Sequence, residues 1–249
     1  LEFDKITTIL FNYCQTNMGV EQVNEMRIHT HQKYIEEALR QTEEFKFIKL
    51  ANQYFPTDFI LDIRKDLKLL GIPGAQLTGE QWLLVRKLSD HIQQVFKWFD
   101  AERQIAYSNL YEVVKSSYYE KAIIECIDLI IDDRGSVKDK ASEDLSKIRT
   151  QLFKKRQELR RIFEKVVQRL AKSGYTADID ESFSNGRRVV AVFSEYKRQV
   201  KGFLHGESDS RKTAFIEPEE TIELNNELYG LEQDELKEVQ KILREEFKD

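Results

Sequence analysis

The most regular hydrophobic pattern of the chain lies between residues 142 and 172. Apolar side chains recur there every three or four residues without a Gly or Pro, which is the period of an α-helix that buries one narrow stripe. Ser142 and the two acidic residues after it predict the start of this helix. The narrow stripe favours pairing with one partner helix, with Lys155 at one position of the seam. The apolar positions are Leu145, Ile148, Leu152, Leu159, Ile162, Val166 and Leu170.

Residues 218–249 predict the partner helix, running back along the first one. Pro218 suits the first position of a helix, and the two glutamates after it favour the positive end of the helix dipole. We expect this helix to be broken or bent at Gly230. Its apolar positions are Leu231, Leu236, Val239, Leu243 and Phe247.

A small sheet is predicted between the two helices. The β-branched and aromatic runs 189–193, 200–204 and 213–216 are typical of short strands, and Asn185-Gly186 is a turn signal. The polar stretch 205–212 predicts an exposed loop. Three strands of this length bury little by themselves, so we expect them to pack against a helix or a partner.

The first 133 residues predict a helical bundle. Thr78 and Gln81 fit a capping box that opens an amphipathic stretch ending near Phe99. Further helices are expected at 30–48, capped by Thr30, at 58–70, ended by a left-handed Gly71, and at 118–131, followed by a turn at 132–135. The core side chains expected on the amphipathic stretch are Trp82, Val85, Leu88, Ile92, Val95, Phe96 and Phe99.

These patterns together predict a mainly α fold. It consists of a helical bundle and a long antiparallel two-helix lever arm that carries a small β-rich, clamp-like tip. The predicted parts are a helical core domain at 1–133, an outgoing lever helix at 134–172, the tip at 173–217 and a returning lever helix at 218–249.

Composition narrows the class of protein. Hydrophobic residues make up 41% of the 249 residues and charged residues 33%, and no run approaches the roughly 20 apolar residues of a membrane span. Two cysteines, Cys14 and Cys126, exclude a disulfide framework within one chain and favour a cytoplasmic setting. The start at Leu1, without an initiator Met or a signal-peptide pattern, predicts a piece of a longer protein with no membrane role.

Motifs for catalysis are absent from the sequence. It has no P-loop, no Gly-x-Ser-x-Gly and no Cys-x-x-Cys. His29-Thr30-His31 has the spacing of a weak metal site on a strand, but it lies in a predicted helix start, so no metal site is expected. The sequence therefore predicts that this chain is not itself an enzyme and holds no cofactor.

Charge is segregated along the chain, although the net charge is only -5. Residues 134–172 carry +8, 173–184 carry -3, 185–213 carry +4 and 214–249 carry -8. One interpretation is that the basic outgoing helix pairs with the acidic returning helix and the charges set their register. The other is that a basic tip binds a phosphate backbone without reading sequence, through Arg187, Arg188, Lys197, Arg198, Lys201, Arg211 and Lys212.

The amino-acid sequence of residues 184–228 resembles that of a known protein family. The motifs that carry the resemblance are Gly186-Arg187, Glu195 with Lys197, Gly202-Phe203-Leu204-His205, Ser208 with Ser210, Thr213-Ala214-Phe215-Ile216-Glu217-Pro218 and Glu223-Leu224-Asn225-Asn226. They are similar to the segment before the ATPase domain in the second bacterial subfamily of the MutS family, which lacks the mismatch-reading domain. The run 132–142 and the opening residues fit too. Arg211 stands where the family usually has Gly, and Gly206 where it usually has Asp, so we expect the loop to bend differently.

The resemblance implies a function for each part of the chain. By resemblance, the helical bundle is the core domain, the two long helices are the lever and the β tip is the clamp. Similar proteins are homodimers whose two clamps close around nucleic acid, duplex or branched DNA, in repair or recombination control. Their ATP and Mg²⁺ belong to an ATPase domain outside this chain, and many add a C-terminal Smr nuclease domain. Some handle stalled ribosomes, so an alternative is a coiled-coil scaffold that engages ribosome, RNA or protein partners.

Overall fold

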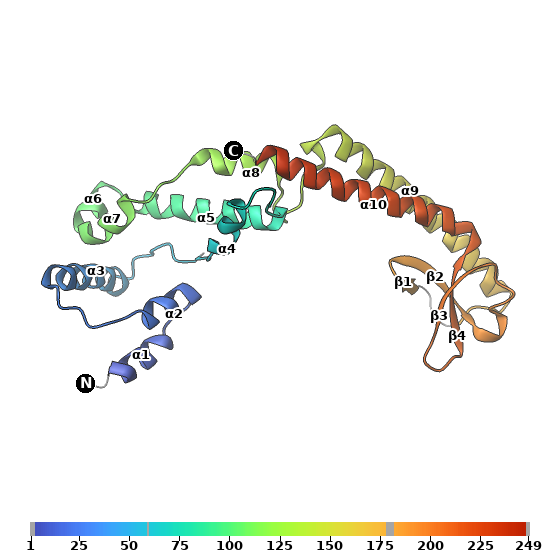
Figure 1. The fold of residues 1–249 in the computed structure, drawn as a ribbon, viewed down its shortest axis with the longest axis horizontal. Coiled ribbons are helices and arrows are strands. Elements are labelled where there is room, and N and C mark those ends of the chain that lie inside the picture. Colours follow the sequence, from blue (N-terminus) through green and yellow to red (C-terminus); the bar gives the residue numbers. More distant parts are fainter. Residues whose placement is uncertain (1–2, 59, 178–181, 248–249) are drawn as a thin grey trace. The chain divides into compact units, whose positions relative to one another are not determined.

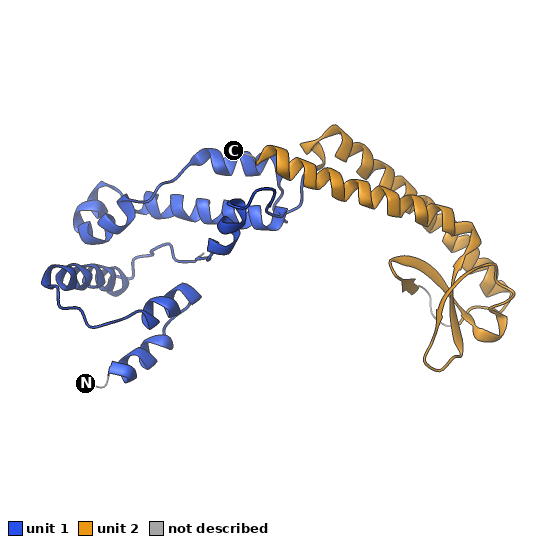
Figure 2. Cartoon of the chain, in the orientation of Figure 1, with its two compact units in different colours: residues 1–138 blue, residues 139–249 orange. Residues whose placement is uncertain are grey.

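The computed structural model describes residues 3–58, 60–177 and 182–247. The described part is mainly helical with one small antiparallel sheet, which confirms the predicted fold class. It divides into two compact units, residues 1–138 and 139–249 (Figure 2). No helix among the described residues has the length and apolar character needed to cross a membrane. The three acidic residues that give 173–184 its charge of -3 lie outside the described residues, as do the last two residues of the chain.

The first unit is built from short and medium helices (Figure 1). One hydrophobic cluster of this unit gathers the buried side chains of Ile48, Trp98 and Phe99, and the indole Nε1 of Trp98 donates to the carbonyl of Tyr54 at 2.6 Å. The helices are α1 (Phe3–Phe11), α2 (Asn17–Asn24), α3 (Gln32–Leu50), α4 (Arg64–Leu70), α5 (Gly79–Trp98), α6 (Ala101–Ala106), α7 (Ser108–Lys115) and α8 (Lys121–Ile130).

Two local predictions for this unit are confirmed. The capping box at α5 is complete, because Thr78 Oγ1 accepts from the Gln81 amide at 3.2 Å and Gln81 Oε1 accepts from the Thr78 amide at 2.8 Å. The turn after α8 is held by Asp132, whose Oδ1 accepts from the amides of Arg134 and Ser136 at 2.9 Å each.

Several helix ends were predicted wrongly. His31, not Thr30, precedes α3, and no side chain caps that helix. The helix expected from 58 begins only at Arg64, where the Asp62 side chain accepts from the Arg64 amide at 3.0 Å and so competes with a helix start further upstream. Gly71 ends α4 with a φ of -76°, so it is not left-handed. The helix expected from 118 begins at 121, where the Glu120 side chain caps it.

In the second unit, two long helices lie side by side (Figure 1). Helix α9 (Glu143–Lys172) begins as predicted, with Ser142 Oγ accepting from the Leu145 amide at 2.9 Å, and at 30 residues it is about 45 Å long. It packs against α10 (Glu219–Glu246) through a seam of apolar side chains. The seam buries Leu152, Leu159, Leu224 and Leu228, with Ile148, Ile162 and Leu231 partly buried against them.

Of the break or bend predicted at Gly230, the break is wrong, since α10 continues through this residue. A helical Gly costs only about 1 kcal/mol relative to Ala, and the seam contacts of Leu228 and Leu231 on either side outweigh that cost. Leu236, predicted in the seam, is 52% exposed. Glu235 and Glu238 face α9 instead, where they accept from Arg149 Nε at 2.7 Å and from Ser142 Oγ at 2.8 Å.

The sheet has four strands rather than the three predicted. They are β1 (Ser182–Ser184), β2 (Arg187–Phe193), β3 (Gly202–Glu207) and β4 (Thr213–Pro218), in the order β1-β2-β4-β3 with antiparallel neighbours. Asn185-Gly186 forms the predicted turn, with positive φ at both residues, and joins β1 to β2. Strand β3 begins later and runs further than expected, so the exposed loop shrinks to 208–212.

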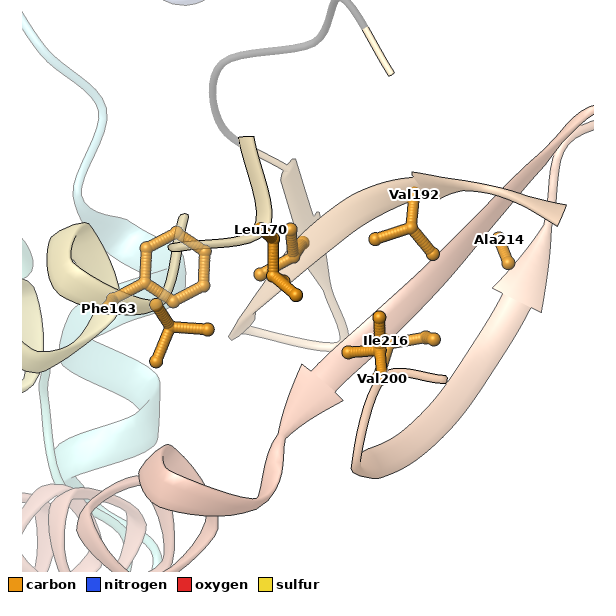
Figure 3. Close-up of a cluster of buried hydrophobic side chains, with 8 residues drawn as sticks. Phe163, Leu170, Val192, Val200, Ala214 and Ile216 are labelled. Atoms are coloured by element: carbon orange, nitrogen blue, oxygen red, sulfur yellow. The ribbon is translucent and has the colours of Figure 1, made fainter. Parts of the chain in front are cut away.

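The sheet packs on the C-terminal part of α9, which confirms the prediction that it packs against a helix or a partner. Figure 3 shows Phe163 and Leu170 of α9 beside Val192 of β2 and Ile216 of β4, with Val200 from the segment before β3. All of these side chains are at most 8% exposed. The small sheet is therefore fixed to the end of the helix pair by a hydrophobic core of its own.

Candidate nucleic-acid interface on the sheet

The seven predicted cations separate into two groups, and three of them are engaged inside the tip. Arg187 donates from Nη1 to Glu217 Oε1 at 2.8 Å and from Nη2 to Asn226 Oδ1 at 2.6 Å. The Arg188 guanidinium lies over the rings of Phe163 and Phe183, 5.8 and 5.6 Å from their centroids.

Lys197 completes this engaged group. Its Nζ pairs with the Glu207 carboxylate, and its side chain is 37% exposed. These three side chains hold the tip together, so their charges are less available to an external phosphate.

The other four cations, Arg198, Lys201, Arg211 and Lys212, are exposed. Two lie in the segment that leads from β2 to β3, and two in the turn between β3 and β4. The Ser194 amide donates to the Lys212 carbonyl at 2.9 Å, so that segment and turn lie next to each other. Within the part of the chain that the structure describes, no carboxylate lies within ion-pair distance of these four side chains. We name them the tip cations.

Arg211 has an unusual backbone. Its φ of 54° is left-handed, which costs a residue with a side chain about 1–2 kcal/mol. Its amide donates to the Ser208 carbonyl at 2.7 Å, closing the turn, and Ser208 Oγ accepts from the Thr213 amide at 3.2 Å. The turn therefore holds the Arg211 side chain in solvent at some cost in stability.

A buried carboxylate network lies beneath the tip. Glu217 is 2% exposed. Its Oε1 accepts from Arg187 Nη1 and from Asn225 Nδ2 at 2.8 Å each, and its Oε2 lies 2.8 Å from His205 Nε2. A β-bulge between Leu204 and Gly206 leaves His205 without a partner on β4 and turns it toward Glu217. The network thus ties β2, β3, β4 and α10 to one another.

The sequence did not predict this network, although its members are among the motif residues that carry the resemblance. The motif residues Gly186-Arg187, Gly202 to His205, Glu217 and Asn225-Asn226 are far apart along the chain, but their polar side chains meet around one carboxylate. The shared motif is therefore explained by packing inside the tip, and not only by contact with a ligand.

Burial of Glu217 opposes its ionisation, but the donors from His205, Asn225 and Arg187 outweigh burial and hold its pKa below the usual value. A carboxylate with a lowered pKa contributes stability above its unfolded pKa, near 4.5, and loses it as pH falls through the folded pKa. We therefore expect the wild type to have a higher free energy of unfolding than Glu217→Gln, with the difference largest at about pH 7 and smaller below about pH 4.5. Urea denaturation across this range measures the difference; a difference that widens toward low pH would contradict the ionised network.

Ion pairs across the helix seam support the interpretation that charge sets helix register. Arg149 pairs with Glu235 at 2.7 Å, Arg156 with Glu232 at 2.9 Å and Arg169 with Glu220 at 2.6 Å. Lys155, predicted at a seam position, pairs with Glu227. Six of the ten basic side chains of α9 are thus matched by acids of α10 or of α9 itself.

No group of three or more His, Cys, Asp or Glu side chains that could hold a metal ion is present among the described residues.

Comparison with known proteins agrees with the resemblance. No protein-family model matches the chain. Over 98% of its length it is 29% identical to a protein named Endonuclease MutS2 from Aquifex aeolicus, and 30% identical to proteins of the same name from Latilactobacillus sakei and Listeria innocua. These similarities support a MutS-related family, in the MutS2 subfamily. The chain spans 31–32% of the length of these relatives, so the endonuclease activity in their name is not assigned to it.

Proposed function

We propose that this chain is the nucleic-acid-binding arm of a MutS-related protein that acts in DNA repair or recombination control. In this proposal, residues 1–133 form the core domain, 134–172 and 218–249 form the lever, and 173–217 form a clamp that holds duplex or branched DNA. The observation that carries the proposal is the set of four tip cations, exposed and without a carboxylate at ion-pair distance among the described residues.

The chemistry of the tip cations favours a phosphate backbone. Long cationic side chains on a turn and a connecting segment can follow a backbone, but they make no fixed pattern for base edges. We expect binding that is independent of sequence and weakens with salt. The left-handed Arg211 fits this role, because a backbone cost at an exposed turn is typical of a functional site.

The lever would transmit force because it is stiff and joined firmly to the clamp. The seam and its ion pairs hold α9 and α10 together, and the Glu217 network joins α10 to three strands. We propose that, in a homodimer, ATP and Mg²⁺ bound outside this chain move two such levers so that the clamps open and close. The chain itself would bind rather than catalyse, and its proposed setting is the cytoplasm.

Charge reversal tests the proposal. The test variant replaces all four tip cations with Glu: Arg198→Glu, Lys201→Glu, Arg211→Glu and Lys212→Glu. It should lower the affinity of the chain for duplex and branched DNA by about 100-fold or more at low salt, because the phosphate contacts are lost. Each lost contact should also reduce the slope of log affinity on log salt by roughly 0.9. Fluorescence anisotropy over a salt series measures both quantities. The matched control reverses four lysines that pair within their own helices, namely Lys115, Lys121, Lys237 and Lys241.

Two outcomes would overturn the proposal. The first is equal loss of affinity in the tip variant and the control, which would reduce the effect to net charge. The second is tighter binding of the wild-type chain to ribosomal subunits than to branched DNA at the same salt, which would favour the ribosome alternative.

A further inference from the structure

The face of α9 turned away from α10 carries a row of cations that the helix seam does not use. Lys154, Arg161, Lys165 and Lys172 are separated by seven, four and seven residues. At 100° per residue, these positions fall within about 40° of one another around the helix. The row is about 27 Å long, since α9 is unbroken from Glu143 to Lys172. We name these four residues the α9 cation row.

The α9 cation row keeps its charge. All four side chains are exposed, and within the described ranges no carboxylate lies at ion-pair distance from them. The two nearest acidic positions on the helix are occupied elsewhere: Glu158 lies 3.7 Å from Lys155 Nζ, and Glu164 accepts from Arg160 Nε at 2.9 Å. The other cations of α9 pair across the seam or within the helix, so the unpaired charge collects on one face.

The surroundings of the row are mostly polar. Its neighbours on the helix surface include Thr150, Gln151, Gln157 and Gln168, all exposed, and the seam leucines lie on the opposite side. Phe153, beside Lys154, is one exposed aromatic side chain next to the row. A protein partner usually covers an interface core with aromatic and apolar side chains and few lysines. A row of like charges with polar neighbours, held at fixed spacing by a helix, fits a regular polyanion better.

We propose that the α9 cation row is a second binding surface for the phosphate backbone of double-stranded nucleic acid, separate from the tip. A row of about 27 Å spans the axial length of roughly eight base pairs, at 3.4 Å per base pair, so it can reach phosphates on both sides of a groove of the duplex. Four contacts would release counterions and contribute about 3.6 to the salt slope of log affinity. The lever would then act as a track along the duplex as well as a support for the clamp.

The test removes the row without touching the seam. The row variant of the whole 249-residue chain carries Lys154→Gln, Arg161→Gln, Lys165→Gln and Lys172→Gln. Its binding to a duplex DNA of about 30 base pairs, which is longer than the row, is compared with that of the wild type. We expect the salt slope to fall by about 3 to 4 and the affinity at about 0.1 M salt to fall at least tenfold. The matched control is Lys115→Gln, Lys121→Gln, Lys237→Gln and Lys241→Gln, which removes four charges elsewhere.

Two results for the salt slope would overturn the inference: a change of less than about 1 in the row variant, or the same change in the row variant and in the control. A wild-type chain that binds no duplex DNA at low salt would also overturn it. The inference is independent of the tip. If the tip variant keeps its affinity while the row variant loses it, the clamp proposal fails and the row stands. The opposite result refutes the row and supports the clamp. Circular dichroism of each variant confirms that α9 is intact, as expected for exposed substitutions.

Discussion

Replacing Glu217 with Ala should destabilise the unit formed by residues 139–249 by about 3 kcal/mol or more. The substitution leaves the Arg187 guanidinium without its carboxylate, and leaves the amide of Asn225 without an acceptor in a buried site. Removing one member of a buried ion pair typically costs about 3–5 kcal/mol, because the partner charge stays in a poorly solvated place. Arg187 is 31% exposed, so water relieves part of that cost and the lower end of the range is expected.

Urea denaturation followed by circular dichroism measures the change, and amide hydrogen exchange locates it. Protection should be lost in β2, β3 and β4 and at the start of α10, which are the elements that the network joins. The matched control is Glu227→Ala, which breaks the ion pair with Lys155 at the partly exposed seam and should cost less than about 1 kcal/mol. Equal destabilisation by the two variants would show that the Glu217 network contributes no more than a surface pair.

The parts of the fold that depend on neighbouring residues could be predicted from sequence. Ser142 caps α9 and Thr78 caps α5 through amides three residues away, and the heptad spacing of α9 specifies its buried stripe. These features need no knowledge of the rest of the chain. Predictions failed where a local preference was outweighed, as at Gly230, where α10 continues through a weak helix former because seam packing outweighs its cost.

The candidate site was predictable in composition but not in geometry. The charge of 185–213 indicated a cationic tip, yet the sequence could not separate the engaged Arg187 from the exposed Arg211. That distinction depends on the pairing of β2 with β4 and on the bulge in β3, which bring Arg187 and His205 to Glu217 across separations of 30 and 12 residues. Side-chain partners at such distances follow from strand register, which the hydrophobic pattern alone leaves open.

Replacing Gly202 with Ala should be at least as damaging as loss of Glu217, with an expected cost of about 3 kcal/mol or more from two separate causes. Gly202 has a φ of 153°, a backbone region that residues with a Cβ rarely adopt. A Cβ built at this position would lie 2.1 Å from the Glu217 carbonyl oxygen and 2.9 Å from Ile216 Cγ2. Since β3 and β4 are hydrogen-bonded at this point, the backbone of β4 cannot move aside without disturbing the strand pairing.

Gly230→Ala and Gly186→Ala separate these causes. Gly230 lies in α10 with ordinary helical geometry and nothing within 4 Å of an added Cβ, so its replacement should stabilise the chain by about 0.5–1 kcal/mol. Gly186 has a φ of 78° but open space around it, so replacing it with Ala should cost about 1–2 kcal/mol of backbone strain without a clash. If Gly202→Ala costs no more than Gly186→Ala in urea denaturation, the close approach of β3 to β4 is not a constraint. If it costs more, the excess measures how tightly the backbone of the motif Gly202 to His205 is held against Glu217, and therefore how rigidly the tip is positioned on the lever.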